Sequence, residues 1–278
     1  MTEEGTGTES LLQAAMEMAR KAGEAHMRHF RSAGLQTEAK FNESDVVTVA
    51  DKEAERIIIS GIRSRFPAHS ILSEESGASH TGGRIRWIID PLDGTTNFSQ
   101  GLPLFSVSIA IEINGEDAVG VVYAPRLDEM FCAVKGSGAF LNGERISCSS
   151  KTTLDKAVAA TGFPVDKDSN PDNNLDNVAR IMPRLRGLRR LGSAALDLCY
   201  VAAGFLDGYW EMNLHEWDVA AGRLIAREAG AAYGLWRNGD DRGICALAAT
   251  PGIYRSLADL LERQKRTPEN KPVLIPSM

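Results

Sequence analysis

The stretch Trp87-Ile-Ile-Asp-Pro-Leu-Asp-Gly-Thr-Thr-Asn-Phe98 decides the fold of this chain and holds its most informative polar residues. Its apolar start predicts a strand that brings Asp90 to the strand's carboxyl end. Pro91 has no backbone N–H and disfavours helix at the residue before it, so the strand ladder should be interrupted there. Gly94 allows a turn that other residues resist. Because Asp90 and Asp93 lie three residues apart across this turn, both carboxylates can face one point.

This turn predicts a cation site beside an anion site. The two carboxylates and the backbone carbonyl of Leu92 between them are hard oxygen ligands of the kind that Mg²⁺ prefers. Gly94, Thr95 and Thr96 are expected to open a helix or a helical turn, whose free N–H groups point at an anion. The two sites lie so close together that they suggest a phosphate held between cations and backbone amides.

Each carboxylate also has a purely structural interpretation. An Asp beside Gly is often a turn residue, and an Asp before a helix is often an N-cap. That interpretation stays open for Asp51 and Asp218, which begin predicted helices, while Glu74 and Glu75 can equally be solvated loop residues. If the carboxylates cluster, their repulsion raises their pKa values, and two or three Mg²⁺ ions would remove that cost and clamp a phosphoester.

The composition is that of an ordinary globular protein. The 278 residues are 43% hydrophobic and 24% charged, and this length fits one large or two smaller domains. The formal net charge of −6 argues against a surface built for nucleic acid. The scattered cysteines indicate free thiols in a reducing compartment, and neither a signal sequence nor a membrane span is apparent, so we expect a cytoplasmic protein.

Hydrophobic periodicity predicts the secondary structure. A helix pair, then an antiparallel meander over 104–141, then alternating strands and helices suggest an α/β or α+β protein of stacked sheet and helix layers, with a boundary near residue 150. The first helix should be capped by Ser10 and end at Gly34, and Pro67 should stop the second. Helices are expected at 10–34, 51–66, 175–186, 194–203, 218–229 and 252–264, strands at 70–73, 85–90, 157–161, 207–212 and 244–249, and a loop at 166–174.

The chain resembles the inositol monophosphatase family of Mg²⁺-dependent, lithium-sensitive phosphatases, and is similar above all to its bacterial inositol-1-monophosphatases. The order and rough spacing of the motifs match from about residue 10 to residue 230. The matching strings are Asp45-Val-Val-Thr-Val-Ala-Asp51, Ser73-Glu-Glu-Ser76, the stretch 87–98, Gly192-Ser-Ala-Ala195 and Trp217-Asp-Val-Ala-Ala221. The resemblance implies a layered αβαβα sandwich of the inositol monophosphatase and fructose bisphosphatase type, usually a homodimer. It implies a single domain over 1–278, divisible into 10–150 and 151–265.

The resemblance also implies roles for individual residues. The metal ligands would be Glu74, Asp90 and the Leu92 carbonyl for a first ion, Asp90, Asp93 and Asp218 for a second, and Glu74 for a weaker third. The attacking water would be oriented or deprotonated by Asp51 and Thr95, which with Glu74 form the catalytic set. The substrate would meet the Gly94 and Thr95 amides at its phosphate, and Gly192, Ser193, Ala194, Glu211 and Asp218 on its alcohol side. Lys40 would have a minor role.

The implied activity is hydrolysis of inositol 1-phosphate to inositol and phosphate by metal-activated water. Histidinol phosphate, fructose 1,6-bisphosphate and 3′-phosphoadenosine phosphates are alternative substrates used by relatives. An alternative of another class is binding to the transcription machinery through a surface independent of catalysis. We expect the site to bind a small phosphomonoester. We do not expect the protein to bind a membrane or nucleic acid.

One segment departs from the family pattern, and some other features are weak evidence for function. The match weakens after Ala229, where the sequence Gly230-Ala-Ala-Tyr-Gly-Leu-Trp-Arg-Asn-Gly-Asp-Asp-Arg242 departs from the family pattern and puts the substrate-side rim in doubt. A solvated face is favoured for four arginines near Gly187, over contact with a subunit, a second substrate charge or nucleic acid. These are Arg184, Arg186, Arg189 and Arg190. His215 is expected to pack or lie at the surface, and Cys199 to lie in the core.

Overall fold

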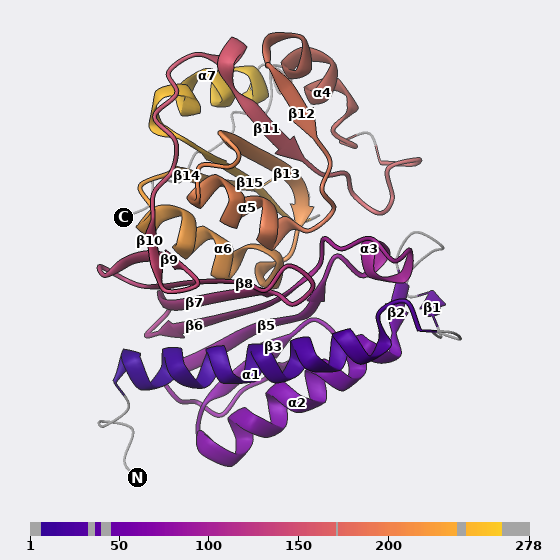
Figure 1. Ribbon diagram of the computed structural model, residues 1–278, viewed down its shortest axis with the longest axis vertical. Coiled ribbons are helices and arrows are strands. Elements are labelled where there is room, and N and C mark those ends of the chain that lie inside the picture. Colours follow the sequence, from indigo (N-terminus) through magenta and orange to yellow (C-terminus); the bar gives the residue numbers. More distant parts are fainter. Residues whose placement is uncertain (1–6, 33–36, 40–45, 171, 238–242, 263–278) are drawn as a thin grey trace.

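The computed structural model describes residues 7–32, 37–39, 46–170, 172–237 and 243–262, and in this part of the chain helices and sheets stack as alternating layers (Figure 1). The layers are, in order, the helices α1 (Thr8–His29) and α2 (Val49–Arg65), an eight-stranded sheet, the helices α5 (Ala194–Ala202) and α6 (Glu216–Glu228), a five-stranded sheet, and the helices α4 (Leu175–Ile181) and α7 (Pro251–Glu262). The expected αβαβα sandwich is confirmed.

The larger sheet has the strand order β10-β9-β8-β7-β6-β5-β3-β4 and is antiparallel except where β3 pairs with β5. Its strands are β3 (Ser70–Ser73), β4 (Gly77–Ser79), β5 (Ile85–Asp93), β6 (Ser106–Ile113), β7 (Glu116–Ala124), β8 (Glu129–Val134), β9 (Gly138–Leu141) and β10 (Glu144–Ile146). The predicted meander is therefore confirmed. Two of its turns are Asn114-Gly115 and Asn142-Gly143, where both residues have positive φ, as tight hairpins require.

The smaller sheet has the order β12-β11-β13-β15-β14. Its strands are β11 (Val158–Thr161), β12 (Gly187–Arg189), β13 (Gly208–Leu214), β14 (Ala232–Arg237) and β15 (Ile244–Ala249), and a separate ribbon pairs β1 (Thr37–Ala39) with β2 (Val46–Thr48). The sequence did not predict β1, β2, β4, β10, β12 or β14. The first five of these have only three residues, too few for a period to show, and β14 is an edge strand that contains Gly234.

Several helix boundaries differ from the sequence prediction, and α2 and α6 each begin two residues before the predicted positions 51 and 218. Helix α1 begins at Thr8 after Gly7, so Ser10 is not its cap, and it ends at His29 because Phe30 turns away to pack on two other phenylalanine rings. Helix α4 ends at Ile181 rather than near 186, since Pro183 follows and cannot donate a helical hydrogen bond. The predictions for Gly34, Lys40 and the tail after 262 fall outside the described residues, as do Asp45 and residues 238–242.

Apolar clusters fill the spaces between the layers. In β5, Trp87 and Ile89 pack towards α1 and α2, while Ile88 between them packs in the cluster around α5 and α6. Both faces of this strand are therefore buried, which is why its sequence is a continuous apolar run. A third cluster lies between the smaller sheet and α7. Cys199 is in the core as expected, and all four cysteines are free thiols. The division into 10–150 and 151–265 stays a prediction.

None of the described helices combines the length and apolar character needed to cross a membrane.

Candidate active site

The end of β5 forms the turn that the sequence predicted. The pairing of β5 with β6 shifts register between Asp90 and Asp93, and the Leu92 amide donates a 3.0 Å hydrogen bond to Asp90 Oδ1. Gly94 has φ 90° and precedes the short helix α3 (Thr95–Ser99). A Cβ at Gly94 would lie only 3.0 Å from the Leu104 carbonyl oxygen, so this position needs glycine for both its φ and its space.

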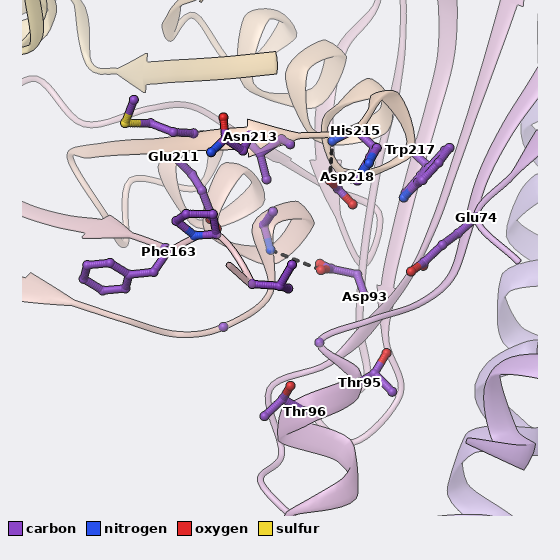
Figure 2. A pocket seen from close by; sticks show the side chains of 18 of the residues that line it. Glu74, Asp93, Thr95, Thr96, Phe163, Glu211, Asn213, His215, Trp217 and Asp218 are labelled. Carbon is purple, nitrogen blue, oxygen red and sulfur yellow. Dashed lines mark hydrogen bonds and ion pairs between the residues drawn. The ribbon is translucent and has the colours of Figure 1, made fainter. Parts of the chain in front are cut away.

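A cavity of about 770 Å³ opens at this turn, between α3 and the smaller sheet. In Figure 2, the carboxylates of Glu74, Asp93 and Asp218 face the same part of the cavity, with Thr95 at its edge. The predicted site residues that line it are Glu74, Asp93, Gly94, Thr95, Gly192, Ala194, Glu211 and Asp218. The others, Asp51, Asp90, Leu92 and Ser193, are buried directly behind or beside the lining. The structure thus brings the predicted residues together, except Lys40, which lies outside the described residues.

The negative charges of the clustered carboxylates repel one another. Burial raises the pKa of Asp90 well above its usual value, and the charges of Glu74, Asp93 and Asp218 raise it further. Burial also raises the pKa of Asp93 to about 7, although hydrogen bonds from α5 oppose the shift. A nearby cation would relieve this repulsion.

The chemistry of these ligands fits a hard divalent cation. Glu74, Asp90, Asp93 and Asp218 supply only oxygen, as does the Leu92 carbonyl, and this suits Mg²⁺ better than a softer metal. As they stand, no three His, Cys, Asp or Glu side chains of the described chain surround a single point closely enough to hold a metal ion. A cation would therefore have to draw the carboxylates together by small side-chain movements.

Asp93 connects the two sheets through the start of α5. Its carboxylate accepts hydrogen bonds from the Ser193 hydroxyl and from the backbone amides of Ala194 (3.2 Å) and Ala195 (2.9 Å). These donors hold Asp93 in one orientation and favour its charged form. The Ser193 hydroxyl is also the N-cap of α5 and is only 1% exposed, so it supports Asp93 and does not line the alcohol side of the cavity.

Asp51 has a structural role and contacts a cavity residue, although the N-cap of α2 is Thr48 and not Asp51 as its N-cap interpretation held. Its Oδ2 accepts hydrogen bonds from the Thr48 amide (2.8 Å) and hydroxyl (2.6 Å), so it caps α2 from the third helical position. Its Oδ1 accepts a 3.0 Å hydrogen bond from the Thr95 hydroxyl, which also lies 3.0 Å from the Leu92 carbonyl oxygen. Burial raises the pKa of Asp51 to about 6. A carboxylate with this pKa, bonded to a hydroxyl that lines the cavity, is suited to accept a proton near neutral pH.

Asp218 is likewise the third residue of its helix, α6, and accepts a 2.6 Å hydrogen bond from the His215 amide. The His215 ring stacks on Trp217 at 4.6 Å and lies 3.7 Å from the Asp218 carboxylate. The expected packing role of His215 is confirmed, and the ring borders the cavity as well.

The other side of the cavity is built around Glu211 on β13. Its carboxylate accepts a 2.7 Å hydrogen bond from the Tyr209 hydroxyl, and burial raises its pKa to about 8. A Cβ at Gly162 would collide with this carboxylate, so Gly162 leaves the space that it occupies. Asn213, two residues on, has φ 60° in a bulge of the strand. The sequence analysis missed Gly162 and Asn213. Their place beside Glu211 becomes visible only in the folded chain.

A third missed residue supports the loop that carries Glu74. Glu55 on α2 accepts hydrogen bonds from the Ser73 hydroxyl (2.5 Å), the Ser76 amide (3.0 Å) and the Ser76 hydroxyl (3.0 Å). It thereby fixes both ends of the segment between Ser73 and Ser76. No local sequence signal distinguishes Glu55 from the other acidic residues of α2.

The four arginines near Gly187 do not form one group. All four are exposed, as expected for a solvated face. Arg190 also lines the cavity, which distinguishes it from the other three. The reason is that Arg190 follows β12 and leads into the Gly192 turn at the cavity wall.

Comparison with known proteins agrees with this geometry. The inositol monophosphatase family matches residues 8–266 of the chain. The Nus factor SuhB of Escherichia coli is 44% identical over 250 residues, 89% of this chain and 94% of that protein. An inositol-1-monophosphatase of Mesorhizobium japonicum is 42% identical over 234 residues, 84% of this chain and 88% of that protein. The solved structure of an inositol monophosphatase from Anabaena (Nostoc) superposes with a TM-score of 0.82 at 38% identity, covering 93% of this chain and 97% of that one. The chain therefore belongs to the inositol monophosphatase family.

Proposed function

We propose that the chain is a Mg²⁺-dependent phosphomonoesterase that hydrolyses inositol 1-phosphate to inositol and phosphate. The observation that carries the proposal is the meeting of Glu74, Asp93 and Asp218, backed by buried Asp90, at a cavity that begins at the Gly94 turn. Membership of the family supports a phosphatase, and the relative named as an inositol-1-monophosphatase supports the substrate. A homodimer in the cytoplasm belongs to the same proposal.

The ligands for Mg²⁺ would be the carboxylates of Glu74, Asp90, Asp93 and Asp218 and the carbonyl of Leu92. Bound Mg²⁺ supplies positive charge opposite the phosphate oxygens and makes a bound water more acidic. The carboxylates that hold it are buried or half-buried and repel one another, so the free energy they gain from a cation is large.

Other residues of the chain would bind the phosphate, orient the attacking water and accept its proton. The first N–H groups of α3, from Gly94 and Thr95, bind phosphate oxygens, because a helix leaves its first amides without intrahelical partners. The Thr95 hydroxyl orients the attacking water, and Asp51, to which it donates, accepts the proton that the water loses. The phosphate is attacked in line, and no covalent intermediate on the enzyme is required.

Glu211 would recognise the alcohol. Glu211 lies on the side of the cavity opposite α3 (Figure 2), and its carboxyl group would accept hydrogen bonds from hydroxyls of the inositol ring. Histidinol phosphate, fructose 1,6-bisphosphate and 3′-phosphoadenosine phosphate are alternative substrates, because the same phosphate and metal groups would serve them. Phosphate release from these four compounds, each at several concentrations with Mg²⁺, tests the assignment. The highest kcat/KM on inositol 1-phosphate supports it, and a higher value on another compound moves the assignment to that compound.

Glu211→Gln is expected to weaken the use of inositol 1-phosphate more than that of a simple aryl phosphate. An interaction made equally in the ground and transition states changes KM more than kcat. Loss of the hydrogen-bond partner of a buried polar group typically costs about 1–3 kcal/mol, so KM for inositol 1-phosphate should rise about 5- to 150-fold. Steady-state kinetics on both substrates measure this difference. Equal losses on both would mean that Glu211 serves the metal site or the fold.

A second candidate function is binding to the transcription machinery. The specific observation in its favour is that a relative 44% identical to this chain is named a Nus factor. Pull-down of RNA polymerase with wild-type and Asp93→Asn protein separates this role from catalysis. Equal capture by both supports a catalysis-independent surface, and no capture by either rules the role out for RNA polymerase itself.

A further inference from the structure

The asparagine at the start of α4 does not cap its helix. Asn174 directly precedes α4 and is fully buried. An asparagine at this position usually has an extended backbone and accepts a hydrogen bond from an amide of the first helical turn. Asn174 instead has a left-handed backbone, with φ 73°, and its side chain makes no capping hydrogen bond. The helix therefore lacks a stabilising cap that this residue could supply, because the side chain is used elsewhere.

The side-chain amide of Asn174 joins the end of β11 to β13. Its Nδ2 donates hydrogen bonds to the Thr161 hydroxyl oxygen (2.8 Å) and to the Gly162 carbonyl oxygen (2.7 Å). Its Oδ1 accepts hydrogen bonds from Trp210 Nε1 (2.9 Å) and from Asn177 Nδ2 (3.1 Å). Both N–H donors and both lone pairs of the amide are thus used. A buried network whose members are all satisfied holds them in one arrangement.

This network reaches the cavity through Gly162. A Cβ at Gly162 would collide with the Glu211 carboxylate, so the Gly162 backbone lies directly against that carboxylate. Glu211 also follows Trp210 on β13, and Trp210 donates to Asn174. Asn174 therefore holds two neighbours of Glu211 at once, the glycine that packs on its carboxylate and the residue that precedes it in the strand.

The same hydrogen bonds fix the start of one cavity wall. Residues 162–166 follow β11, and all five line the cavity, where Phe163 lies on the same side as Glu211 (Figure 2). The chain beyond them folds back on itself, since the Asp166 carbonyl accepts hydrogen bonds from the amides of Ser169 (3.0 Å) and Asn170 (2.9 Å). The place of this wall relative to Glu211 therefore depends on where Gly162 is held.

We propose that Asn174 is a positioning residue for recognition of the alcohol part of the substrate. By holding Gly162, it keeps Glu211 and the wall of residues 162–166 at the separation that fits a polyol ring. Asn174 is fully buried and does not line the cavity, so it acts through these groups and leaves the hydrolytic step unchanged. The proposal rests on the proposed function, in which Glu211 binds the alcohol.

Three variants test this role, each assayed with inositol 1-phosphate and with a simple aryl phosphate. Asn174→Gly keeps the positive φ and removes all four hydrogen bonds of the side chain. Asn174→Asp keeps the shape of the side chain and its acceptor oxygen but loses the hydrogen bonds donated to Thr161 and Gly162. Asn177→Ala is the matched control, because Asn177 is buried in the same network but donates to Asn174 and to the Met212 sulfur.

Both Asn174 variants are expected to raise KM for inositol 1-phosphate about 3- to 10-fold, the effect of losing one hydrogen bond, with kcat unchanged. KM and kcat for the aryl phosphate should stay as in the wild type, because that substrate has no hydroxyls for Glu211 to bind. Asn177→Ala should leave the ratio of the two KM values unchanged. Thermal unfolding checks that each variant is folded at the assay temperature.

Equal rises in KM on both substrates, or the same change of ratio in Asn177→Ala, would show that Asn174 only stabilises the fold and would overturn the proposal. An unchanged KM for inositol 1-phosphate in Asn174→Asp would overturn it as well, because the donated hydrogen bonds would then have no effect. If phosphate release from the panel of substrates assigns another alcohol, that compound replaces inositol 1-phosphate in this comparison.

Wild-type protein that releases no phosphate from any compound tested would instead refute the proposed phosphatase function. Hydrogen exchange would then decide the positioning of the wall alone. Exchange of the amides of residues 162–166 must be faster in Asn174→Gly than in the wild type and in Asn177→Ala. Equal exchange in all three proteins would overturn the role of Asn174.

Discussion

Asp90→Asn is expected to lower kcat for phosphate release by at least about 10²–10³-fold, the range seen when one catalytic electrostatic contact is removed. Asp90 is 2% exposed and lies among Glu74, Asp93 and Asp218, so it is placed to share more than one cation. The fold should survive, because the amide oxygen of asparagine can still accept the hydrogen bond from the Leu92 amide. Removing one of several repelling buried charges should also not lower the melting temperature.

Steady-state kinetics at several Mg²⁺ concentrations, together with thermal unfolding, check this result. Asp176→Asn is a suitable control, because Asp176 is exposed in the first turn of α4 and is not among the residues that line the cavity. A near-normal rate for Asp90→Asn at ordinary Mg²⁺ would show that the metal ligands have been assigned wrongly.

Asp51→Asn should lower kcat by about 10²–10⁴-fold, the usual contribution of a general base. The pKa of Asp51 is raised to about 6, so in the wild-type protein the carboxylate is charged above that pH and protonated below it. Only the charged form accepts a proton, and wild-type activity should therefore fall as pH drops through about 6. In the variant that acidic limb should disappear. The cap of α2 should persist, because asparagine can still accept from the Thr48 amide.

The pH dependence of kcat/KM for both proteins, measured between pH 5 and pH 8 at saturating Mg²⁺, is the check. If Asp51→Asn keeps an acidic limb near pH 6, the titration belongs to another group. If its rate equals that of the wild type at neutral pH, Asp51 acts only as a helix cap.

The parts of the fold that the sequence predicted are those set by local chemistry. Pro91 and Gly94 fix the turn after β5 by their own backbone restrictions, and the Asn-Gly pairs specify the meander hairpins in the same way. The site followed partly from the residues, through Asp90 and Asp93, and partly from the resemblance, which alone connected Glu74 and Asp218 to them.

The parts that could not be predicted depend on contacts between distant segments. Ser193 was expected to face the alcohol, but its hydroxyl is used by Asp93, a contact that exists only because α5 packs against the end of β5. Arg189 and Arg190 are adjacent and chemically identical, yet one lies outside the cavity and the other lines it. That difference is set by the short strand β12 and the turn at Gly192, neither of which has a distinctive sequence pattern.

The central claim, that these carboxylates hold Mg²⁺ for phosphate hydrolysis, is tested most directly by removing the metal. The protein is dialysed against EDTA, assayed for phosphate release from inositol 1-phosphate, and assayed again after Mg²⁺ is restored, with and without Li⁺. An all-oxygen ligand set for a hard cation predicts no measurable release in EDTA and recovery with Mg²⁺, and the family resemblance predicts inhibition by Li⁺. Full turnover in excess EDTA would contradict the account.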